Sequence, residues 1–184
     1  MEDIDNTNKQ FETIIGLCKE VFMAKMTDYG SSWRVLRPSS LTDQIYIKAS
    51  RIRSIEAKGQ QKIHEGIKPE YIGIVNYSVI ALIQIELDPG KDLDLGIGET
   101  EKLYDKYINI AKDLMLDKNH DYGEAWRNMR LSSLTDIILM KLKRIKQIED
   151  HSGKTFVSEG VDSNYYDIIN YSVFALIKIV KSEK

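Results

Sequence analysis

Residues 76–83 read Asn-Tyr-Ser-Val-Ile-Ala-Leu-Ile, and residues 170–177 repeat this stretch 94 positions later as Asn-Tyr-Ser-Val-Phe-Ala-Leu-Ile. Each stretch lies within a longer segment, roughly 69–87 and 162–182, that places apolar residues on almost every side of a helix. A helix that is hydrophobic nearly all round is a buried one. The two segments therefore predict two central helices, one in each half of the chain.

The repeat extends over most of the sequence. Residues 25–34 read Lys-Met-Thr-Asp-Tyr-Gly-Ser-Ser-Trp-Arg, and residues 118–127 read Lys-Asn-His-Asp-Tyr-Gly-Glu-Ala-Trp-Arg. Apolar residues at helical spacing predict a further helix before each copy, over roughly 8–27 and 100–118. An internal repeat of this length sets the architecture, because each copy must form the same structural unit.

Another helix is predicted between these two in each half. It runs from just after Ser40 to about Lys58, and from just after Ser133 to about His151. These serines, or the threonines two positions further on, are expected to cap the helices. The glycine of each Asp-Tyr-Gly motif is expected to end the helix before it.

The sequence thus predicts an all-α protein, built as a tandem duplication of a three- to four-helix unit. The first repeat spans residues 1–87, a linker rich in turn-forming residues spans 88–98, and the second repeat spans 99–184. Repeats of this size have modest cores by themselves. We therefore expect them to pack across a pseudo-two-fold axis, as a fused dimer, and to form one compact domain. The sequence does not decide between a monomer with this internal pseudo-dimer and a homodimer.

Composition restricts the partners of the chain. The net charge of −2 provides no basic field for duplex nucleic acid, and no apolar run approaches the ~18 residues that span a bilayer. The acidic N-terminus does not resemble a signal peptide. Cys18 is the single cysteine and fits a reducing compartment. These features predict a cytoplasmic protein with no membrane partner.

Two cationic residues stand out in the second repeat. Lys141 and Arg144 lie three positions apart on one helix face, and both recur in the first repeat as Lys48 and Arg51. A guanidinium offers a two-pronged contact to phosphate and an ammonium offers a point charge, so this pair is suited to phosphate groups. A solvated helix surface is the alternative interpretation.

An acidic residue distinguishes the two repeats. Asp167 and Asn170 point the same way from an otherwise apolar helix, whereas the first repeat has Gly73 and Asn76 at these positions. Only the second repeat therefore offers a carboxylate there. The asparagines either reach a ligand pocket or form a hydrogen bond in the core that fixes the helix register.

The Asp-Tyr-Gly motif of the second repeat contains Asp121 and Tyr122, and Trp126 follows it. Aromatic side chains stack on nucleobases, so Tyr122 and Trp126 could border a base; an anchor in the core is the alternative. Asp136, near the start of its helix, either interacts with the helix dipole or joins a metal site.

Together these residues resemble the nucleotide-modification-associated domain of the first type, which occurs in bacterial and phage proteins. The shared pattern is Lys-x-x-Asp-Tyr-Gly, then Trp, then Asp-x-x-x-x-Lys-x-x-Arg, then Asp-x-x-Asn-Tyr, and it covers nearly the whole chain in two copies. In the second repeat it rests on Lys118, Asp121, Tyr122, Gly123, Trp126, Asp136, Lys141, Arg144, Asp167, Asn170 and Tyr171. The resemblance implies a nucleotide partner.

More distantly, the helix order is similar to that of MazG-like all-α nucleoside triphosphate pyrophosphohydrolases, in which acidic residues hold Mg²⁺ against the triphosphate. This similarity implies Asp167 and Glu159 as catalytic residues and Mg²⁺ ligands, with Asp136 as a further ligand. The residues implied for substrate binding are Lys118, Asp121, Tyr122, Trp126, Lys141, Arg144 and Asn170. The chain lacks the Glu-Glu-x-x-Glu motif of those enzymes, so metal-dependent hydrolysis stays open.

Two functions follow from these features. The first is a nucleotide-binding protein of nucleotide metabolism or modification, with or without pyrophosphohydrolase activity, in which the first repeat completes the pocket. The alternative is a non-enzymatic helical module that senses a nucleotide or binds another protein. In that module the repeated polar residues form internal contacts, such as an ion pair between Asp121 and Arg144.

Overall fold

The computed structural model describes residues 2–58, 66–151, 153 and 160–183 of the chain. Within these residues every regular element is a helix and no β-strand occurs, so the all-α prediction is confirmed. The elements in chain order are α1 (Glu2–Tyr29), the 3₁₀ helix η1 (Ser32–Val35), α2 (Pro38–Lys58), α3 (Lys68–Glu86), α4 (Ile97–Tyr122), the 3₁₀ helix η2 (Ala125–Asn128), α5 (Leu131–Asp150) and α6 (Val161–Ser182).

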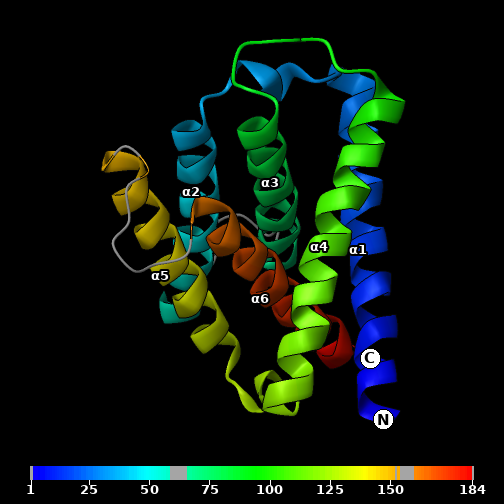
Figure 1. Ribbon diagram of the computed structural model, residues 1–184. Coiled ribbons are helices and arrows are strands. Elements are labelled where there is room, and N and C mark those ends of the chain that lie inside the picture. The colour runs from blue at the N-terminus through cyan, green and yellow to red at the C-terminus, as the bar shows by residue number, and fades with distance from the viewer. Residues whose placement is uncertain (1, 59–65, 152, 154–159, 184) are drawn as a thin grey trace.

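The helices pack in layers, and each layer contains one helix from each repeat. Figure 1 shows α1 beside α4 on one flank, α3 and α6 in the middle, and α2 with α5 on the other flank. The middle helices are the most buried; Ile74, Val79, Ile168 and Val173 are inaccessible to solvent. The two isoleucine-rich helices thus form the centre of a bundle, as predicted, and the apolar surface that they bury holds the repeats together.

Hydrogen bonds cross between the repeats in a mirrored pattern. The hydroxyl of Tyr71 lies 2.7 Å from that of Thr135, and the hydroxyl of Tyr165 lies 2.7 Å from that of Thr42. Tyr165 and Thr135 are the repeat equivalents of Tyr71 and Thr42. A contact in which residue i meets residue j, and j meets i, is the signature of a two-fold axis. The two repeats therefore pack as a fused dimer.

The same threonines bind glutamates of the other repeat. Thr135 donates a hydrogen bond to Glu56 at 2.9 Å, and Thr42 donates one to Glu149 at 2.8 Å. Burial raises the pKa of both glutamates. The expectation that these threonines cap their helices is wrong: both lie inside α2 and α5, where their hydroxyls join the repeats.

Ion pairs show that α1 and α4 run antiparallel. Lys19 lies 2.8 Å from Asp105, and Lys112 lies 2.7 Å from Glu12. Helix α1 begins at Glu2, several residues before the predicted start near position 8. Thr7, in this added turn, contacts the segment that follows α4.

The added turn of α1 is fixed by polar contacts with η2 and the residue before it. The Thr7 hydroxyl is fully buried and donates to Glu124, and Arg127 donates to Thr7 and to Gln10. These contacts join residues far apart in the sequence, which is why helical periodicity alone misses the first turn.

Glycines end the first helix of each repeat, as predicted. Gly30 and Gly123 have φ of +59° and +60°, the left-handed region that glycine adopts without strain. Each donates its N–H to the helix, Gly30 to Met26 and Gly123 to Asn119, both at 2.9 Å. The chain can then turn sharply into η1 and η2, which place Trp33 and Trp126.

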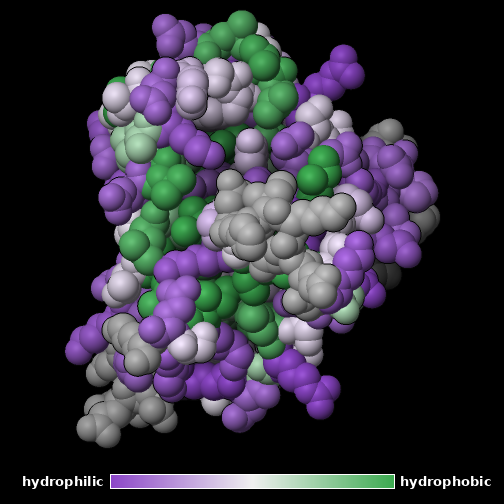
Figure 2. All heavy atoms as spheres, turned by 180° about the vertical axis from the view of Figure 1, so that it is seen from behind, coloured by the Kyte–Doolittle hydropathy of each residue, from purple (hydrophilic) through white to green (hydrophobic). Residues whose placement is uncertain are grey.

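Hydrophilic side chains cover most of the rear surface, and apolar ones reach it in separate patches (Figure 2). None of the helices within the described ranges combines the length and the apolar character needed to cross a bilayer.

Candidate functional site

A cavity of about 970 Å³ opens in the second repeat, between the C-terminal halves of α4 and α5 and one face of α6, with η2 contributing a further wall. This volume is in the range of small-molecule sites. Eight residues that the sequence singles out line it: Lys118, Tyr122, Trp126, Lys141, Arg144, Asp167, Asn170 and Tyr171.

Asp167 lies at the centre of an ionic cluster in this cavity. One of its carboxylate oxygens is 2.5 Å from the ammonium of Lys118, and the other is 2.5 Å from that of Lys141. Asp167 and Lys141 are both buried, with 7% and 9% of their surface exposed. Because each oxygen binds a different lysine, Asp167 draws two ammonium groups from α4 and α5 together.

Arg144 adds a third cation, one turn beyond Lys141 on α5. It is exposed and lines the cavity. Within the described ranges its guanidinium has no ion-pair or hydrogen-bond partner, so the Asp121–Arg144 ion pair of the interaction-module interpretation does not form. An unpaired guanidinium beside two clustered ammonium groups makes the cavity suited to an anion.

Trp126 turns an edge, not a face, to the cavity. Its ring stacks on Phe174 at 4.3 Å and 3°, and the guanidinium of Arg127 lies 4.5 Å from its centre. Two groups this close must cover opposite faces of the ring. Trp126 therefore lines the cavity as a residue of the core with both ring faces occupied, and contact of its edge with a base stays a prediction.

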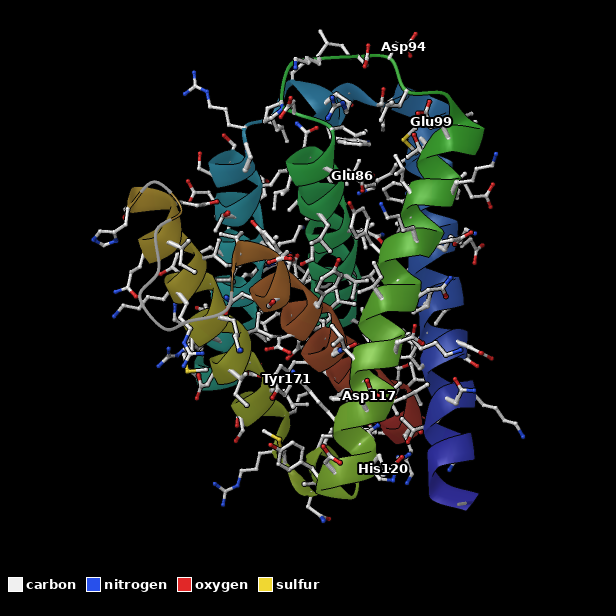
Figure 3. All side chains as sticks on the ribbon, in the orientation of Figure 1. Glu86, Asp94, Glu99, Asp117, His120 and Tyr171 are labelled. Atoms are coloured by element: carbon white, nitrogen blue, oxygen red, sulfur yellow. The ribbon has the colours of Figure 1, made fainter. Side chains whose placement is uncertain are left out.

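Two tyrosines have rings available to the cavity. Tyr122 ends α4 and is 74% exposed, while Tyr171 of α6 is partly buried. Tyr171, labelled in Figure 3, lies between α5 and the C-terminal part of α4. Burial raises the pKa of the Tyr171 hydroxyl, which keeps it protonated and able to donate a hydrogen bond at neutral pH.

Three polar atoms among the lining residues are buried without a hydrogen-bond partner in the described part of the chain: Asn164 Oδ1, Asn170 Oδ1 and Trp126 Nε1. The amide nitrogens of both asparagines are engaged, that of Asn164 with the carbonyl of Gly160 and that of Asn170 with the carbonyl of Ala111, both at 2.9 Å. Leaving a buried polar atom unpaired costs about 1–3 kcal/mol. Such a group lining a cavity indicates a place for a ligand.

Sequence reasoning missed Asn164. The signal was present, because Asn164 lies one turn before Asp167 on the same face of α6, and its repeat equivalent is the charged residue Glu70. An exchange of carboxylate for amide at one position of a repeat marks a change in what that position binds.

The other proposed acidic residues do not join Asp167. Asp121 lies at the exposed end of α4, where its carboxylate is 3.2 Å from His120, labelled in Figure 3. Asp136 lies 3.7 Å from Arg53 of the first repeat. The mirrored contact is that of Asp43 with Lys146, and both pairs belong to the contact between repeats. Glu159 lies outside the described residues.

The described residues do not fit a Mg²⁺ site. No group of three or more His, Cys, Asp or Glu side chains comes together among them. Mg²⁺ is held by carboxylates and other oxygens in octahedral geometry, whereas both oxygens of Asp167 are bound by ammonium groups. Asp136 is not among the described lining residues, and its carboxylate pairs with Arg53; its assignment as a metal ligand stays a prediction. We derive no reaction step through a metal.

The equivalent place in the first repeat is filled. Glu70 binds Lys48 at 3.3 Å and also binds Arg51. The Lys48 side chain lies across Gly73; a Cβ built on this glycine would stand 2.8 Å from Lys48 Cε. The Lys48 ammonium lies 5.8 Å from the ring centre of Tyr77. Lys48 thus occupies the space that the Asp167 side chain takes in the second repeat.

The chain is thus a helical tandem repeat with a cationic cavity in its second copy. It belongs to a family whose model matches both repeats. The family model described as nucleotide modification associated domain 1 matches residues 25–85 and 118–179, one match in each repeat. No curated protein and no solved structure matches the chain, so the MazG-like similarity stays a prediction.

Proposed function

We propose that this protein binds a nucleotide in the cavity of its second repeat. The observation that carries the proposal is the convergence of Lys118, Lys141 and Arg144 on one cavity of about 970 Å³ that also has aromatic walls. Phosphate needs cationic hydrogen-bond donors, and a base needs flat apolar surface. The association of the family with nucleotide modification supports the same ligand class.

The residues have distinct parts in this proposal. Arg144 offers its unpaired guanidinium to two phosphate oxygens, and Lys141 and Lys118 add point charges. Asp167 is a positioning residue, because its carboxylate holds both ammonium groups within 2.5 Å. Tyr122 borders the base with its exposed ring.

Binding without metal-dependent hydrolysis fits the described residues best. The proposal of Mg²⁺-dependent pyrophosphate release requires at least two carboxylates around one ion, and the described part of the cavity has one, Asp167. We therefore expect nucleotide binding to persist in EDTA. Pyrophosphate release from nucleoside triphosphates with Mg²⁺ or Mn²⁺ would contradict this and would restore the hydrolase hypothesis.

Calorimetric titration with AMP, GMP, CMP, TMP and their di- and triphosphates tests the proposal. Replacing Arg144 by Ala should weaken binding about 10-fold or more, since it removes a charge-assisted contact. The matched control is Arg51→Ala, which breaks the ion pair with Glu70 in the first repeat and should leave nucleotide affinity unchanged. The proposal fails if no nucleotide binds, or if both variants bind equally well.

A further inference from the structure

The first repeat contains an anion of its own at its cationic pair. The Glu70 carboxylate, 7% exposed, binds Lys48 through one oxygen at 3.3 Å and Arg51 through the other. The repeat equivalents of these two cations are Lys141 and Arg144. Glu70 therefore shows where a bound anion lies relative to this lysine and arginine.

The second repeat has no carboxylate at the equivalent position. Asn164 stands at the position of Glu70. It is 3% exposed, lines the cavity, and has an unpartnered Oδ1 among the described residues. Its amide brings no charge, and Arg144 has no partner within the same ranges. The place that a carboxylate fills in one repeat is thus left without an internal anion in the other.

This position is also polar and structurally fixed. The Asn164 amide nitrogen donates to the Gly160 carbonyl at 2.9 Å, which holds the side chain at the start of α6. Lys141 is held by Asp167, one turn further along the same helix. The cations therefore keep their places without a ligand, and an anion that enters need not order them first.

From this internal comparison, and resting on the proposed function, we infer that the ligand is a nucleoside monophosphate. Its single phosphate takes the place in the second repeat that the Glu70 carboxylate takes in the first, bound by Lys141 and Arg144 without a metal. The Asn164 Oδ1 then accepts a hydrogen bond from a hydroxyl of the attached sugar.

The charges of the cavity agree with one phosphate. Leaving His151 aside, the lining residues that the structure describes include three cations, Lys118, Lys141 and Arg144, and one carboxylate, that of Asp167, which is an excess of two positive charges among them. A phosphate monoester carries about −1.5 to −2 at pH 7. One phosphate therefore balances the cavity. Two further phosphates would exceed it, and the described residues have no carboxylate set to bring a compensating metal.

A titration that varies only the number of phosphates tests this inference on the unmodified protein. AMP, GMP, CMP and TMP are each compared with their di- and triphosphates, with Mg²⁺ and with EDTA. We expect at least one monophosphate to bind, with an affinity that EDTA does not change, and no more than about a 10-fold gain from added phosphates. Triphosphate binding that is tighter than this and depends on Mg²⁺ would overturn the inference, while the proposed function would stand.

A substitution then tests the position of the phosphate. Asn164→Glu installs the carboxylate of the first repeat, and we expect monophosphate affinity to fall about 10-fold or more while Tm holds or rises. The matched control, Glu70→Asn, should lower Tm and leave monophosphate affinity unchanged. Monophosphate affinity of folded Asn164→Glu equal to that of the parent protein would refute the placement. If Asn164→Glu does not fold, the phosphate titration decides alone. If no nucleotide binds the unmodified protein, the proposed function itself is wrong. The Asn164→Glu result bears only on where the phosphate lies, so the two failures can be told apart.

Discussion

The two repeats share a scaffold but place one acidic residue differently. In the first repeat the acid is Glu70, which neutralises Lys48 and Arg51, and Lys48 lies over Gly73. In the second repeat the acidic residue is Asp167, which lies one turn further along the central helix, and Asn164 stands at the position equivalent to Glu70.

This difference separates a closed site from an open one. Asp167 holds Lys141 away from the helix surface that Lys48 covers in the first repeat, and it leaves Arg144 unpaired within the described ranges. Two exchanges on one helix face thus distinguish an internally neutralised cluster from a cavity that is lined by cations. Duplication allows such a difference, because one copy can keep the bundle stable while the other acquires the ligand site that we propose.

Removal of the Asp167 carboxylate should cause the largest changes in stability and in nucleotide affinity. Asp167→Ala removes the carboxylate that binds the buried Lys141 and Lys118, so we expect a loss of about 3 kcal/mol in stability. Nucleotide affinity should fall about 100-fold, because the two ammonium groups no longer converge. Urea unfolding and calorimetry measure the two effects.

The matched change in the first repeat is Gly73→Ala. Its Cβ would meet the flexible end of Lys48 at 2.8 Å, which can shift, so nucleotide affinity should not change. Equal affinities of Asp167→Ala and Gly73→Ala would show that the two repeats do not differ in function.

Much of this arrangement could be predicted from the sequence. Apolar residues on nearly every side mark α3 and α6 as central, and local spacing alone places Lys141 with Arg144, and Asp167 with Asn170, on shared helix faces. These are properties of a single helix, so the 3.6-residue period reveals them.

The contacts between elements could not be predicted in this way. The pairing of Asp136 with Arg53 depends on how α2 packs against α5, and that of Lys118 with Asp167 depends on where α4 ends over α6. Stacking of Trp126 on Phe174 likewise requires η2, a short 3₁₀ turn with no periodic signal. Site residues that gather from several helices are visible in the sequence only as candidates.

Conversion of the first repeat into a second site would sharpen the comparison. The double variant Glu70→Asn with Gly73→Asp copies the second repeat, because the aspartate displaces Lys48 from the helix surface and the asparagine removes the carboxylate that Arg51 binds. We expect calorimetric stoichiometry to rise from one nucleotide per chain toward about two, the new site being about 10-fold weaker because its walls are not matched to the ligand. A folded variant that still binds one nucleotide would show that further residues close the first repeat.

A smaller effect should come from the asparagines of the central helices. The Tyr104 hydroxyl donates to Asn76 Oδ1 at 3.0 Å, whereas the repeat equivalent of Tyr104 is Phe11, and Asn170 Oδ1 has no partner among the described residues. Tyr104→Phe should destabilise the protein by about 1–2 kcal/mol, since it leaves a buried acceptor unpaired. Phe11→Tyr should stabilise it by about 1 kcal/mol if the new hydroxyl reaches Asn170. Equal and negligible changes in urea unfolding would mean that neither acceptor is isolated from water.

The smallest expected change is in the pH dependence of Tm, and it comes from Glu56 and Glu149, the two glutamates that bind threonines of the opposite repeat. Burial raises the pKa of Glu56 and of Glu149 in the folded state. The folded protein then binds these protons more readily than the unfolded chain, so their contribution to stability is full below the unfolded pKa and is lost as pH rises through the folded pKa. Glu56→Gln and Glu149→Gln should each flatten the fall in Tm as pH rises above the unfolded glutamate pKa of about 4.3, and by the same amount, because each accepts the same threonine hydrogen bond across the axis. Unequal changes in the two pH profiles would show that the two-fold relation of the contacts does not extend to their energies.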